Sequence, residues 1–263
     1  MNPSMSSFVH PTAIVADGAS IGEGCYIGPF CTLGNETVLR RGVRLESHVV
    51  VDGIVAIGEG THIFPFATVG MAPQDLKYAG EPTSVEIGER NVIREFVTIH
   101  RGTAGGGRTT RIGSDNLFMA QSHVAHDCQL GDGIIMANGA TLAGHVEIAD
   151  RANIGAYSGV HQFCRIGLEA FVGGYSVVVK DAPPFATIQG NHARCYGLNR
   201  VGMKRRGYPS KTISDLHHAF HFLLSAKLNT SQAVERIKQE IKDCKEVDLL
   251  LDFIESSKRG VVL

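Results

Sequence analysis

Five histidines lie between positions 100 and 161, and their chemistry suits a reactive site. They are His100, His123, His126, His145 and His161. Near neutral pH an imidazole can accept a proton from a hydroxyl group and later return it to a leaving group. The cluster therefore predicts acid–base chemistry in this part of the chain.

Asp127 directly follows His126. The pair supplies a base, the imidazole, and a carboxylate that can orient it. A carboxylate can hold an imidazole and stabilise its protonated form, although neighbouring side chains of a strand usually point apart. Zinc binding is the alternative, because histidine is a common zinc ligand. We favour the general base and assign no metal ligand.

A repeat of six residues predicts the elements that carry these histidines. Apolar residues occupy every sixth position from Ile21 to Val69 and again from Ile112 to Val172, and Ile87, Ile93 and Ile99 keep the spacing between the two runs. This period fits neither a helix nor a strand alone. It fits a short strand plus a turn, so three repeats form a triangular coil of 18 residues. About eight such coils would stack at the strand spacing of about 4.8 Å.

Two other positions of the repeat are informative. A small residue stands four positions after most of the apolar ones, and four of these are Cys25, Cys31, Cys128 and Cys164. We interpret these cysteines as buried small side chains rather than redox or metal groups. Glycine often follows the apolar residue directly, as at Gly22. There we expect a corner with left-handed backbone.

The stacking of coils places distant residues together. Adding 18 to a residue number moves one coil along the same column, so His126, Gly144 and Gln162 share a column. His161 lies in the next column, and His100 joins it once one inserted loop is allowed for. Because adjacent coils are only about 5 Å apart, these residues are expected to line one groove at one corner of the prism.

Such a groove suits acyl transfer to an alcohol. His126 would accept the hydroxyl proton, and the N–H of Gly144, which no side chain obstructs, would stabilise an oxyanion. No serine or cysteine stands out beside His126 as a nucleophile. Direct attack by the acceptor is therefore favoured over an acyl-enzyme.

The repeat is interrupted twice, and loops on a rigid scaffold often carry function. Asp75 and Glu81 occupy positions where the repeat requires an apolar residue. This predicts an excursion over residues 71–86. Residues 101–111 are rich in glycine and arginine, which predicts a flexible loop.

After the repeats the apolar pattern becomes helical. Apolar faces that include Ile213, Val234 and Val247 predict three helices, and Thr230 or Ser231 is expected to cap the second. The predicted domains are a β-helix over residues 1–190 and a helical domain over 191–263.

Composition excludes several classes of protein. The chain has 263 residues, is 43% hydrophobic and carries a net charge of −1, so no basic field favours nucleic acid. No apolar run is long enough for a membrane span, and the first residues do not form a signal peptide. The six cysteines contain no CxxC pair, which indicates a reducing compartment and predicts a cytoplasmic protein.

Specific motifs follow one another along almost the whole chain. They include QDLKYAGEPT at 74–83, IHRGT at 99–103, HVAHDC at 123–128, TLAGHV at 141–146, VHQFC at 160–164, QGNHA at 189–193 and MKRRGY at 203–208. In these motifs the chain resembles the UDP-N-acetylglucosamine O-acyltransferases, which catalyse the first step of lipid A biosynthesis. The resemblance implies a left-handed parallel β-helix with a C-terminal α-helical domain. It also implies transfer of an (R)-3-hydroxyacyl group from acyl carrier protein to the 3-hydroxyl of UDP-N-acetylglucosamine.

The same resemblance implies roles for individual residues. His126 would be the general base, Asp127 its partner and Gly144 the oxyanion donor. Substrate contacts would come from Gln74, Asp75, Lys77, His100, His123, His145, His161, Gln162, His192, Asn199, Arg205 and Arg206. Phe171, Gly174 and Tyr175 are candidates for an acyl-chain ruler.

The resemblance implies no cofactor beyond the phosphopantetheine thioester of the acyl carrier protein, which is a co-substrate. It implies a homotrimer with the cleft between subunits. One position departs from the family pattern. An acidic residue often stands two positions after the asparagine matched by Asn199, whereas this chain has Val201.

Several other functions stay open at this point. The N-acyltransferase of the same pathway shares the scaffold but carries an extra N-terminal domain, whereas the repeats here begin by Phe8. A 3-amino sugar as acceptor is not distinguished from the 3-hydroxyl sugar. A zinc-dependent hydratase like the γ-type carbonic anhydrases, a CoA-dependent acetyltransferase and a non-catalytic scaffold are weaker alternatives.

Overall fold

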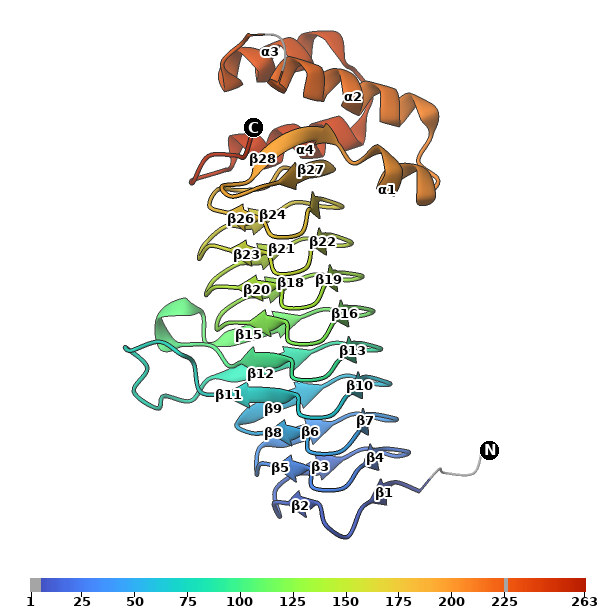
Figure 1. Ribbon diagram of the computed structural model, residues 1–263, viewed down its shortest axis with the longest axis vertical. Coiled ribbons are helices and arrows are strands. Elements are labelled where there is room, and N and C mark those ends of the chain that lie inside the picture. Colours follow the sequence, from blue (N-terminus) through green and yellow to red (C-terminus); the bar gives the residue numbers. More distant parts are fainter. Residues whose placement is uncertain (1–5, 225–226) are drawn as a thin grey trace.

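The computed structural model describes residues 6–224 and 227–263 of the chain. Most strands contain only two residues, and they form three parallel sheets that wind around one long axis (Figure 1). Residues 1–5 of the predicted β-helical domain and 225–226 of the helical domain lie outside the described part.

The three sheets are named here in chain order. The first sheet contains β1 (Phe8–Val9), β4 (Tyr26–Ile27), β7 (Arg44–Leu45), β10 (His62–Ile63), β13 (Val92–Ile93), β16 (Leu117–Phe118), β19 (Ile135–Met136), β22 (Asn153–Ile154), β25 (Phe171–Val172), β27 (Ala186–Gln189) and β28 (Arg194–Leu198). The second sheet contains β2 (Ile14–Val15), β5 (Thr32–Leu33), β8 (Val50–Val51), β11 (Thr68–Met71), β14 (Thr98–His100), β17 (His123–Val124), β20 (Thr141–Leu142), β23 (Gly159–Val160) and β26 (Val177–Val178). The third contains β3 (Ser20–Ile21), β6 (Thr37–Leu39), β9 (Ile54–Ile57), β12 (Ser84–Ile87), β15 (Thr109–Ile112), β18 (Gln129–Leu130), β21 (Glu147–Ile148) and β24 (Arg165–Ile166).

Three corners join these sheets into a triangular prism. The histidine corner lies between the second and third sheets and contains residues 125–128, 143–146 and 161–164. The aromatic corner joins the first sheet to the second, and the charged corner joins the third sheet of one coil to the first sheet of the next. In a triangular section each corner faces the opposite side, so the first sheet lies opposite the histidine corner.

The register of the second sheet confirms the predicted columns. Val124 pairs with Leu142, and Leu142 pairs with Val160. Ile99 pairs with Val124, which places His100 in the column of Ala125 across the inserted loop. The coil of 18 residues is therefore the structural unit that brings the histidines together.

The interior of the prism is built as the repeat predicts. The apolar residues that recur every six positions, such as Ile57 and Val124, are fully buried. The small residues four positions after an apolar one, such as Ala67 and Cys128, are fully buried as well. Each coil thus buries apolar surface only against its neighbours, which is the stacking logic of solenoid proteins.

The predicted reason for the glycines was wrong. Positive φ occurs three positions after the apolar residue, as at Asp127 (φ 60°) and His145 (φ 62°), and not at the glycine that follows it directly. Those glycines are needed because adjacent coils approach closely. A Cβ on Gly22 would lie 2.8 Å from the Arg40 carbonyl carbon, and one on Gly28 would lie 2.7 Å from the Glu46 carbonyl oxygen.

Both interruptions of the repeat leave the prism between the second and third sheets. One connects β11 to β12 through residues 72–83, and the other connects β14 to β15 through residues 101–108, with a short 3₁₀ helix at Ala104–Gly106. The strands resume at Ser84 and Thr109, earlier than the predicted ends of the excursions. Figure 1 shows the two loops side by side on one edge of the prism.

The helical tail covers the last coils of the prism (Figure 1). It contains α1 (Arg200–Arg205), α2 (Ser210–Leu224), α3 (Thr230–Glu240) and α4 (Lys245–Glu255). The three long helices occur where the apolar faces predict them, whereas α1 has no such signal. Asn229, not Thr230 or Ser231, caps α3, because its side chain accepts from Gln232 N and Gln232 reciprocates. Before α1, β28 extends the first sheet antiparallel to β27 up to Leu198.

Within the described residues no helix is both long and apolar enough to cross a membrane.

Candidate active site

His126 and Asp127 contact each other at the histidine corner. The His126 side chain is 15% exposed, and its Nδ1 lies 2.9 Å from Asp127 Oδ2. Neighbouring side chains of a strand would point apart, but Asp127 lies in the turn with φ of 60°. The left-handed backbone folds its carboxylate back beside the imidazole. The turn therefore brings together two side chains that would point apart in a strand.

The Asp127 carboxylate is buried and strongly held. It is 3% exposed, and it accepts hydrogen bonds from Thr103 Oγ1 at 2.6 Å and from Thr103 N at 3.0 and 3.1 Å. Charge-assisted bonds of this kind hold an ionised carboxylate in place. Asp127 thus fixes the 101–108 loop and the His126 ring at the same time. Thr103 belongs to the IHRGT motif but was assigned no role from the sequence, because this contact depends on the path of the loop.

The hydrogen bond to Asp127 determines the tautomer that we assign to His126. A carboxylate can only accept, so Nδ1 carries the proton and Nε2 keeps a free lone pair. The ring edge with Nε2 lies against Gly144: a Cβ at that position would be 2.6 Å from Nε2. The Gly144 N–H donates to no acceptor within residues 6–224 and 227–263. A proton acceptor and a free N–H donor therefore stand side by side.

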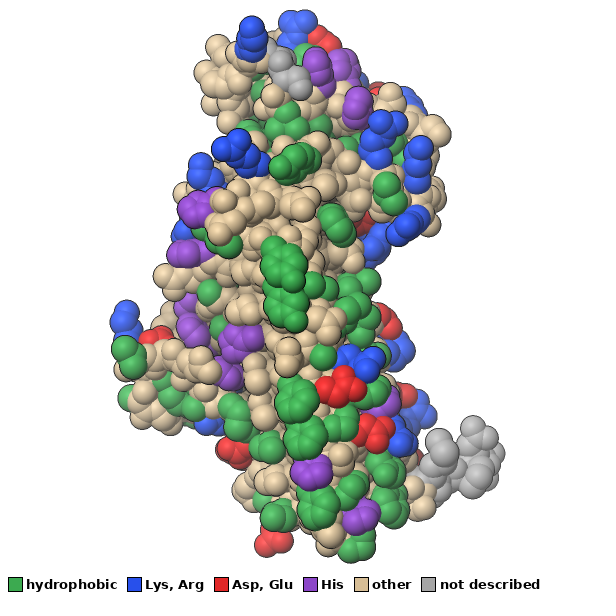
Figure 2. All heavy atoms as spheres, in the orientation of Figure 1, with side chains coloured by type: hydrophobic (Ala, Val, Ile, Leu, Met, Phe, Trp, Pro, Cys, Tyr) green, Lys and Arg blue, Asp and Glu red, His purple; other side chains and the backbone are tan. Residues whose placement is uncertain are grey.

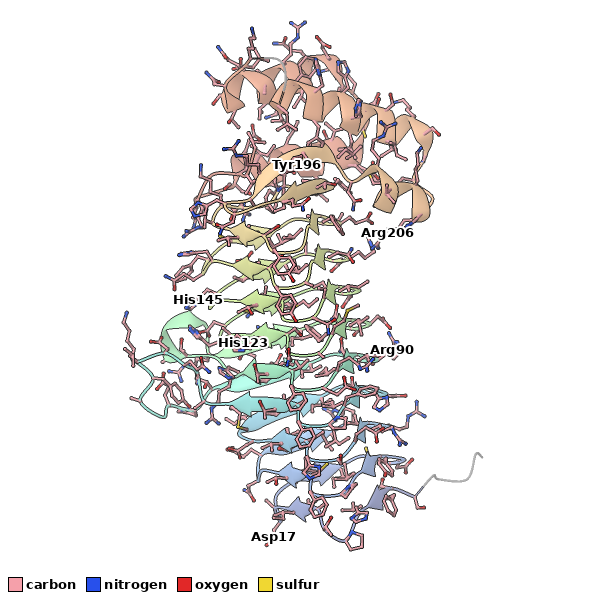
Figure 3. The ribbon with its side chains drawn as sticks, viewed as in Figure 1. Asp17, Arg90, His123, His145, Tyr196 and Arg206 are labelled. Carbon is pink, nitrogen blue, oxygen red and sulfur yellow. The ribbon has the colours of Figure 1, made fainter. Side chains whose placement is uncertain are left out.

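The remaining histidines form two ring pairs around this centre. His145 makes an edge contact with His126 at 5.0 Å between centroids and stacks on Phe163 at 4.4 Å. His100 makes an edge contact with His123 at 4.8 Å, and His123 Nδ1 lies 2.6 Å from Thr98 Oγ1. Figure 3 shows His123 and His145 on the same side of the prism as the two loops.

Burial favours the uncharged form of His100, His123 and His145. It lowers the pKa of His100 to about 4, with smaller contributions from His123 and His126. Burial also lowers the pKa of His123. It lowers the pKa of His145 as well, where the carboxylates of Asp127 and Asp75 oppose the shift. The effect of Asp75 shows that the first loop brings its carboxylate near the histidines.

The depressed pKa of His100 predicts a loss of stability in acid. Between pH 6.5 and about pH 4 the unfolded chain binds a proton that folded His100 does not, so stability falls as the pH falls through this window. We expect a contribution of about 3 kcal/mol per chain at the acid end of this window. His100→Leu removes this term, and chemical unfolding of both proteins across the window measures it. Parallel stability curves for the two proteins would contradict the prediction.

The two loops are tied to each other beside the site. Glu81 Oε1 accepts from Ala104 N at 3.1 Å, and Asp75 Oδ1 accepts from Lys77 N at 3.0 Å. Gln74 and Lys77 are exposed, and Asp75 is partly buried. These side chains are thus available to a ligand at the histidine corner.

The predicted nucleotide-end residues gather elsewhere. Asn199, Arg205 and Arg206 line a cavity of about 640 Å³ against the first sheet, together with Phe171 and Val201. Asn199 caps α1 by accepting from Gly202 N at 3.0 Å. Figure 3 shows Arg206 and His145 on opposite sides of the molecule. One chain therefore does not bring the predicted nucleotide residues to the predicted base.

The other predicted residues are distributed along the prism. His161 and Gln162 are exposed on the next coil of the histidine corner, where His161 Nδ1 lies 3.2 Å from Arg259. His192 lines a cavity of about 790 Å³ further toward the tail. Gly174 and Tyr175 lie at the aromatic corner, where Tyr175 stacks on Tyr157 at 5.4 Å.

His126, Asp127 and His145 are the group of three potential metal ligands found in the described ranges. The hydrogen bonds from Thr103 and His126 already use the Asp127 oxygens. The closeness of these three residues is therefore explained by their hydrogen bonds and does not require a metal ion.

The chain is similar to known proteins over almost the whole length of both. The model for domain 2 of UDP N-acetylglucosamine O-acyltransferase matches residues 181–262. An acyl-[acyl-carrier-protein]–UDP-N-acetylglucosamine O-acyltransferase of Thermodesulfovibrio yellowstonii is 48% identical over 96% of this chain and 98% of the relative. The structure of LpxA, a UDP-N-acetylglucosamine acyltransferase from Bacteroides fragilis, superposes with a TM-score of 0.95 at 36% identity, over 97% of this chain and 100% of that one. The structure of LpxA from Acinetobacter baumannii gives a TM-score of 0.83 at 43% identity, over 98% of both chains.

Proposed function

Because the chain belongs to the acyl-[acyl-carrier-protein]–UDP-N-acetylglucosamine O-acyltransferase family, we propose that it moves an (R)-3-hydroxyacyl group from acyl carrier protein to the 3-hydroxyl of UDP-N-acetylglucosamine. The protein is an acyltransferase of lipid A biosynthesis with the left-handed β-helix of that family. This confirms the family, the fold class and the reaction class predicted from the motifs. The acyl group, the acceptor atom and the mechanism are our proposal.

The hydrogen bond between His126 and Asp127 carries the proposed mechanism. His126 Nε2 takes the proton of the acceptor hydroxyl while the hydroxyl oxygen attacks the thioester carbonyl. Asp127 stabilises the imidazolium that forms. The Gly144 N–H donates to the oxyanion of the tetrahedral intermediate. The intermediate then expels the phosphopantetheine thiolate, which receives the proton from His126.

The environment of the nearest thiol supports direct attack by the acceptor. Cys128 is two positions from His126, but its side chain is buried and its Sγ donates to Ala143 O at 3.2 Å. Burial raises the pKa of Cys128 to about 12. A thiol with such a pKa is almost never a thiolate and is a poor nucleophile. We therefore propose that no acyl-enzyme forms.

Turnover by the purified protein tests this function. The acyl donor would be hydroxyacyl carrier proteins of graded chain length, and the acceptor would be UDP-N-acetylglucosamine or its 3-amino analogue. We expect transfer to the hydroxyl sugar. We propose that the chain needs no metal or other cofactor, so EDTA should leave the rate unchanged. Exclusive use of the amino sugar, or stoichiometric zinc required for turnover, would contradict the proposal.

We further propose that a complete site draws on two copies of the chain. The base lies at the histidine corner, whereas the cavity with Arg205 is lined by strands of the first sheet, which lies opposite that corner. A second copy that presents its first sheet to this corner would complete the cleft. Closed threefold symmetry would give three equal sites, in agreement with the trimer that the family resemblance implies.

The aromatic corner offers a surface for such an assembly. Phe66 stacks between His48 and Phe96, with ring centroids 4.8 and 5.0 Å away, and Phe30 continues the ladder. The phenylalanines are exposed in the single chain. Figure 2 shows hydrophobic side chains in a line down this face. Contiguous exposed apolar surface of this kind marks contact sites.

Mixed assemblies test the shared site. His126→Ala and Arg205→Ala would each be weakly active alone at low UDP-sugar concentration. If one copy supplies the base and another supplies Arg205, random mixing of the two variants restores roughly a quarter of the wild-type sites, and about a third in trimers that contain both variants. Co-expression with two different affinity tags isolates the mixed assemblies for assay. No recovery in assemblies shown to contain both variants would contradict a shared site.

The free cysteines support a cytoplasmic location. Cys25, Cys31, Cys128, Cys164 and Cys244 are buried and Cys195 is partly buried, and all six are unpaired within the described residues. Reduced cysteines are usual in the cytoplasm.

A further inference from the structure

A buried carboxylate stands at the charged corner and has no part in the mechanism described above. Glu169 is 2% exposed. Its Oε1 accepts from Arg151 Nε at 2.8 Å and from Tyr208 Oη at 3.0 Å. Its Oε2 has no hydrogen-bond partner among the described residues, and Arg206 Nε lies 3.6 Å from it. A buried charge persists only when it is paired.

Arg206 connects this carboxylate to the cavity on the first sheet. It lines the cavity of about 640 Å³ together with Asn199 and Arg205. It also lines a second cavity of about 580 Å³ that contains Glu169 and Tyr208. The guanidinium thus lies between a buried acid and the cavity that we assign to the nucleotide.

Glu169 also allows two guanidinium groups to lie close together. Arg206 Nη2 donates to the backbone oxygen of Arg151 at 3.3 Å, while the Arg151 side chain pairs with Glu169. Without the carboxylate, two like charges would face each other in a partly desolvated space, and they would move apart. The carboxylate therefore determines where the Arg206 side chain stays.

The backbone of Glu169 holds the start of α1 at the same point. Asn199 Nδ2 donates to Glu169 O at 3.1 Å, and Asn199 Oδ1 caps α1. Glu169 adopts φ of 54° in the corner turn, which aims its side chain at Tyr208 and Arg206. One residue of the prism therefore positions both ends of the segment from Asn199 to Arg206.

We propose that Glu169 is a positioning residue that holds Arg206 ready for the phosphate groups of the nucleotide sugar. The inference rests on the proposed function. Glu169 fixes the Nε edge of the guanidinium, and the backbone oxygen of Arg151 takes one Nη2 hydrogen. The remaining N–H groups are left for a diphosphate in the cavity that Arg206 lines. A planar guanidinium held in this way suits phosphate oxygens.

Glu169→Gln tests the proposal, because it keeps the size of the side chain and removes the charge. We expect the KM for UDP-N-acetylglucosamine to rise about tenfold. The kcat and the KM for the acyl carrier protein should change by less than about twofold. A loosened fold would instead change both KM values and lower the Tm. Equal shifts in both KM values, or no shift in the KM for the sugar, would overturn the proposal.

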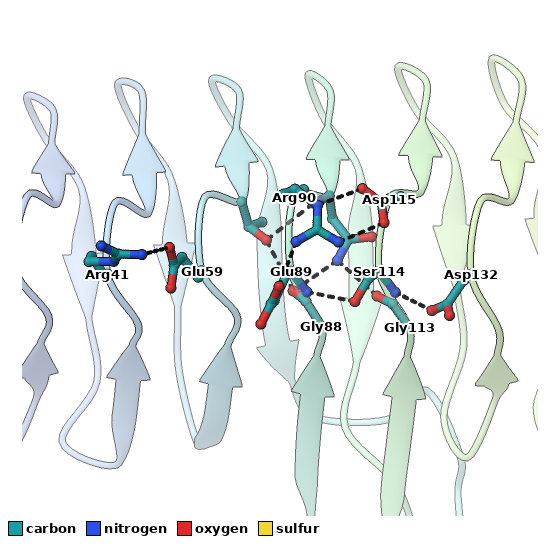
Figure 4. A network of polar contacts seen from close by, with 11 residues as sticks. Arg41, Glu59, Gly88, Glu89, Arg90, Gly113, Ser114, Asp115 and Asp132 are labelled. Atoms are coloured by element: carbon teal, nitrogen blue, oxygen red, sulfur yellow. Dashed lines mark hydrogen bonds and ion pairs between the residues drawn. The ribbon is translucent and has the colours of Figure 1, made fainter.

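The matched control removes a carboxylate of the same corner that does not line the cavity. Asp115 pairs with Arg90 through Oδ1 and Oδ2, both at 2.8 Å, several coils closer to the N-terminus (Figure 4). Asp115→Asn breaks this exposed pair and should leave the KM for the sugar unchanged. A tenfold rise in this control as well would show a general effect of charge along the corner and would overturn the specific role.

A second variant of Glu169 and a double variant with Arg206 test the same role. Glu169→Gly also removes the carboxylate, and glycine accepts the positive φ at that position, so this variant replaces Glu169→Gln if the latter fails to fold. In a background of Arg206→Met, Glu169→Gln should add no further rise in KM, since the effect acts through Arg206. Additive effects in the double variant would overturn the proposal.

Calorimetric binding of UDP separates this inference from the proposed function. If the wild type binds UDP but does not turn over the sugar, the proposed function fails. Weaker UDP binding by Glu169→Gln would then still support the positioning role. Equal UDP binding by the wild type and this variant would overturn it in either case.

Discussion

Replacing His126 by alanine is expected to lower kcat by about 10²- to 10⁴-fold, because positioned general bases contribute rate factors of this size. His145, whose ring contacts His126, is not held in the same way. His145 lies 3.9 Å from Asp127 through Nδ1, so it lacks the hydrogen bond that fixes the tautomer of His126. The KM for UDP-N-acetylglucosamine should change little. Steady-state kinetics with saturating acyl carrier protein measures both quantities.

A second substitution separates the proton acceptor from the hydrogen bond to Asp127. His126→Gln keeps a side chain that can donate to Asp127 but cannot take the proton of an alcohol. It should therefore be as inactive as the alanine variant. An unchanged Tm and unchanged UDP binding would show that both variants keep their fold. Turnover within about tenfold of the wild type in either variant would remove His126 from the role of general base.

Gly144→Ala is expected to have the second largest effect, with a loss of about 100-fold in kcat/KM. A Cβ on Gly144 would lie 2.6 Å from His126 Nε2 and 3.1 Å from Nδ1. Such contacts are too short for non-bonded atoms, so the imidazole must rotate or move. The base would then be displaced from the acceptor, and the added methyl group would crowd the N–H that we assign to the oxyanion.

Gly159→Ala is the matched control for this variant. Gly159 lies in β23 of the second sheet, two positions before His161 of the histidine corner, and a Cβ there meets no atom within 4 Å. Both glycines lack positive φ, so alanine costs little backbone strain at either position. Normal kinetics for Gly159→Ala together with the loss in Gly144→Ala would locate the effect at His126. Equal kinetics for both variants would show that the close approach to the imidazole has no consequence for catalysis.

The columns of the site could be predicted without any structure. The repeat fixed the position of each residue in a coil of 18, and the observed pairing of Val124 with Leu142 and Val160 agrees with it. This succeeded because neighbouring coils share one register, so an error cannot accumulate along the prism. The same arithmetic placed Gly144 directly above His126.

The details of the turns could not be predicted in this way. Glycines such as Gly22 predict positive φ at their own positions in the repeat, whereas positive φ occurs two positions later, at residues such as Asp127. That backbone turn is what brings the Asp127 carboxylate to His126. Thr103 was missed for a related reason, since its loop has no repeat to define its path. The short α1 has too few residues to show an apolar period.

The prism, its columns and the family could be read from the chain alone, because these depend on a regular spacing of side chains and on long ordered motifs. The division of the site became visible only in three dimensions. The fold places His145, which contacts His126, on one side of the molecule and Arg206 on the opposite side. It also joins Arg206, at the end of α1, to Glu169 in the prism. Sequence spacing gives the column of a residue, but the side of the prism that faces a ligand depends on how the chain closes in three dimensions.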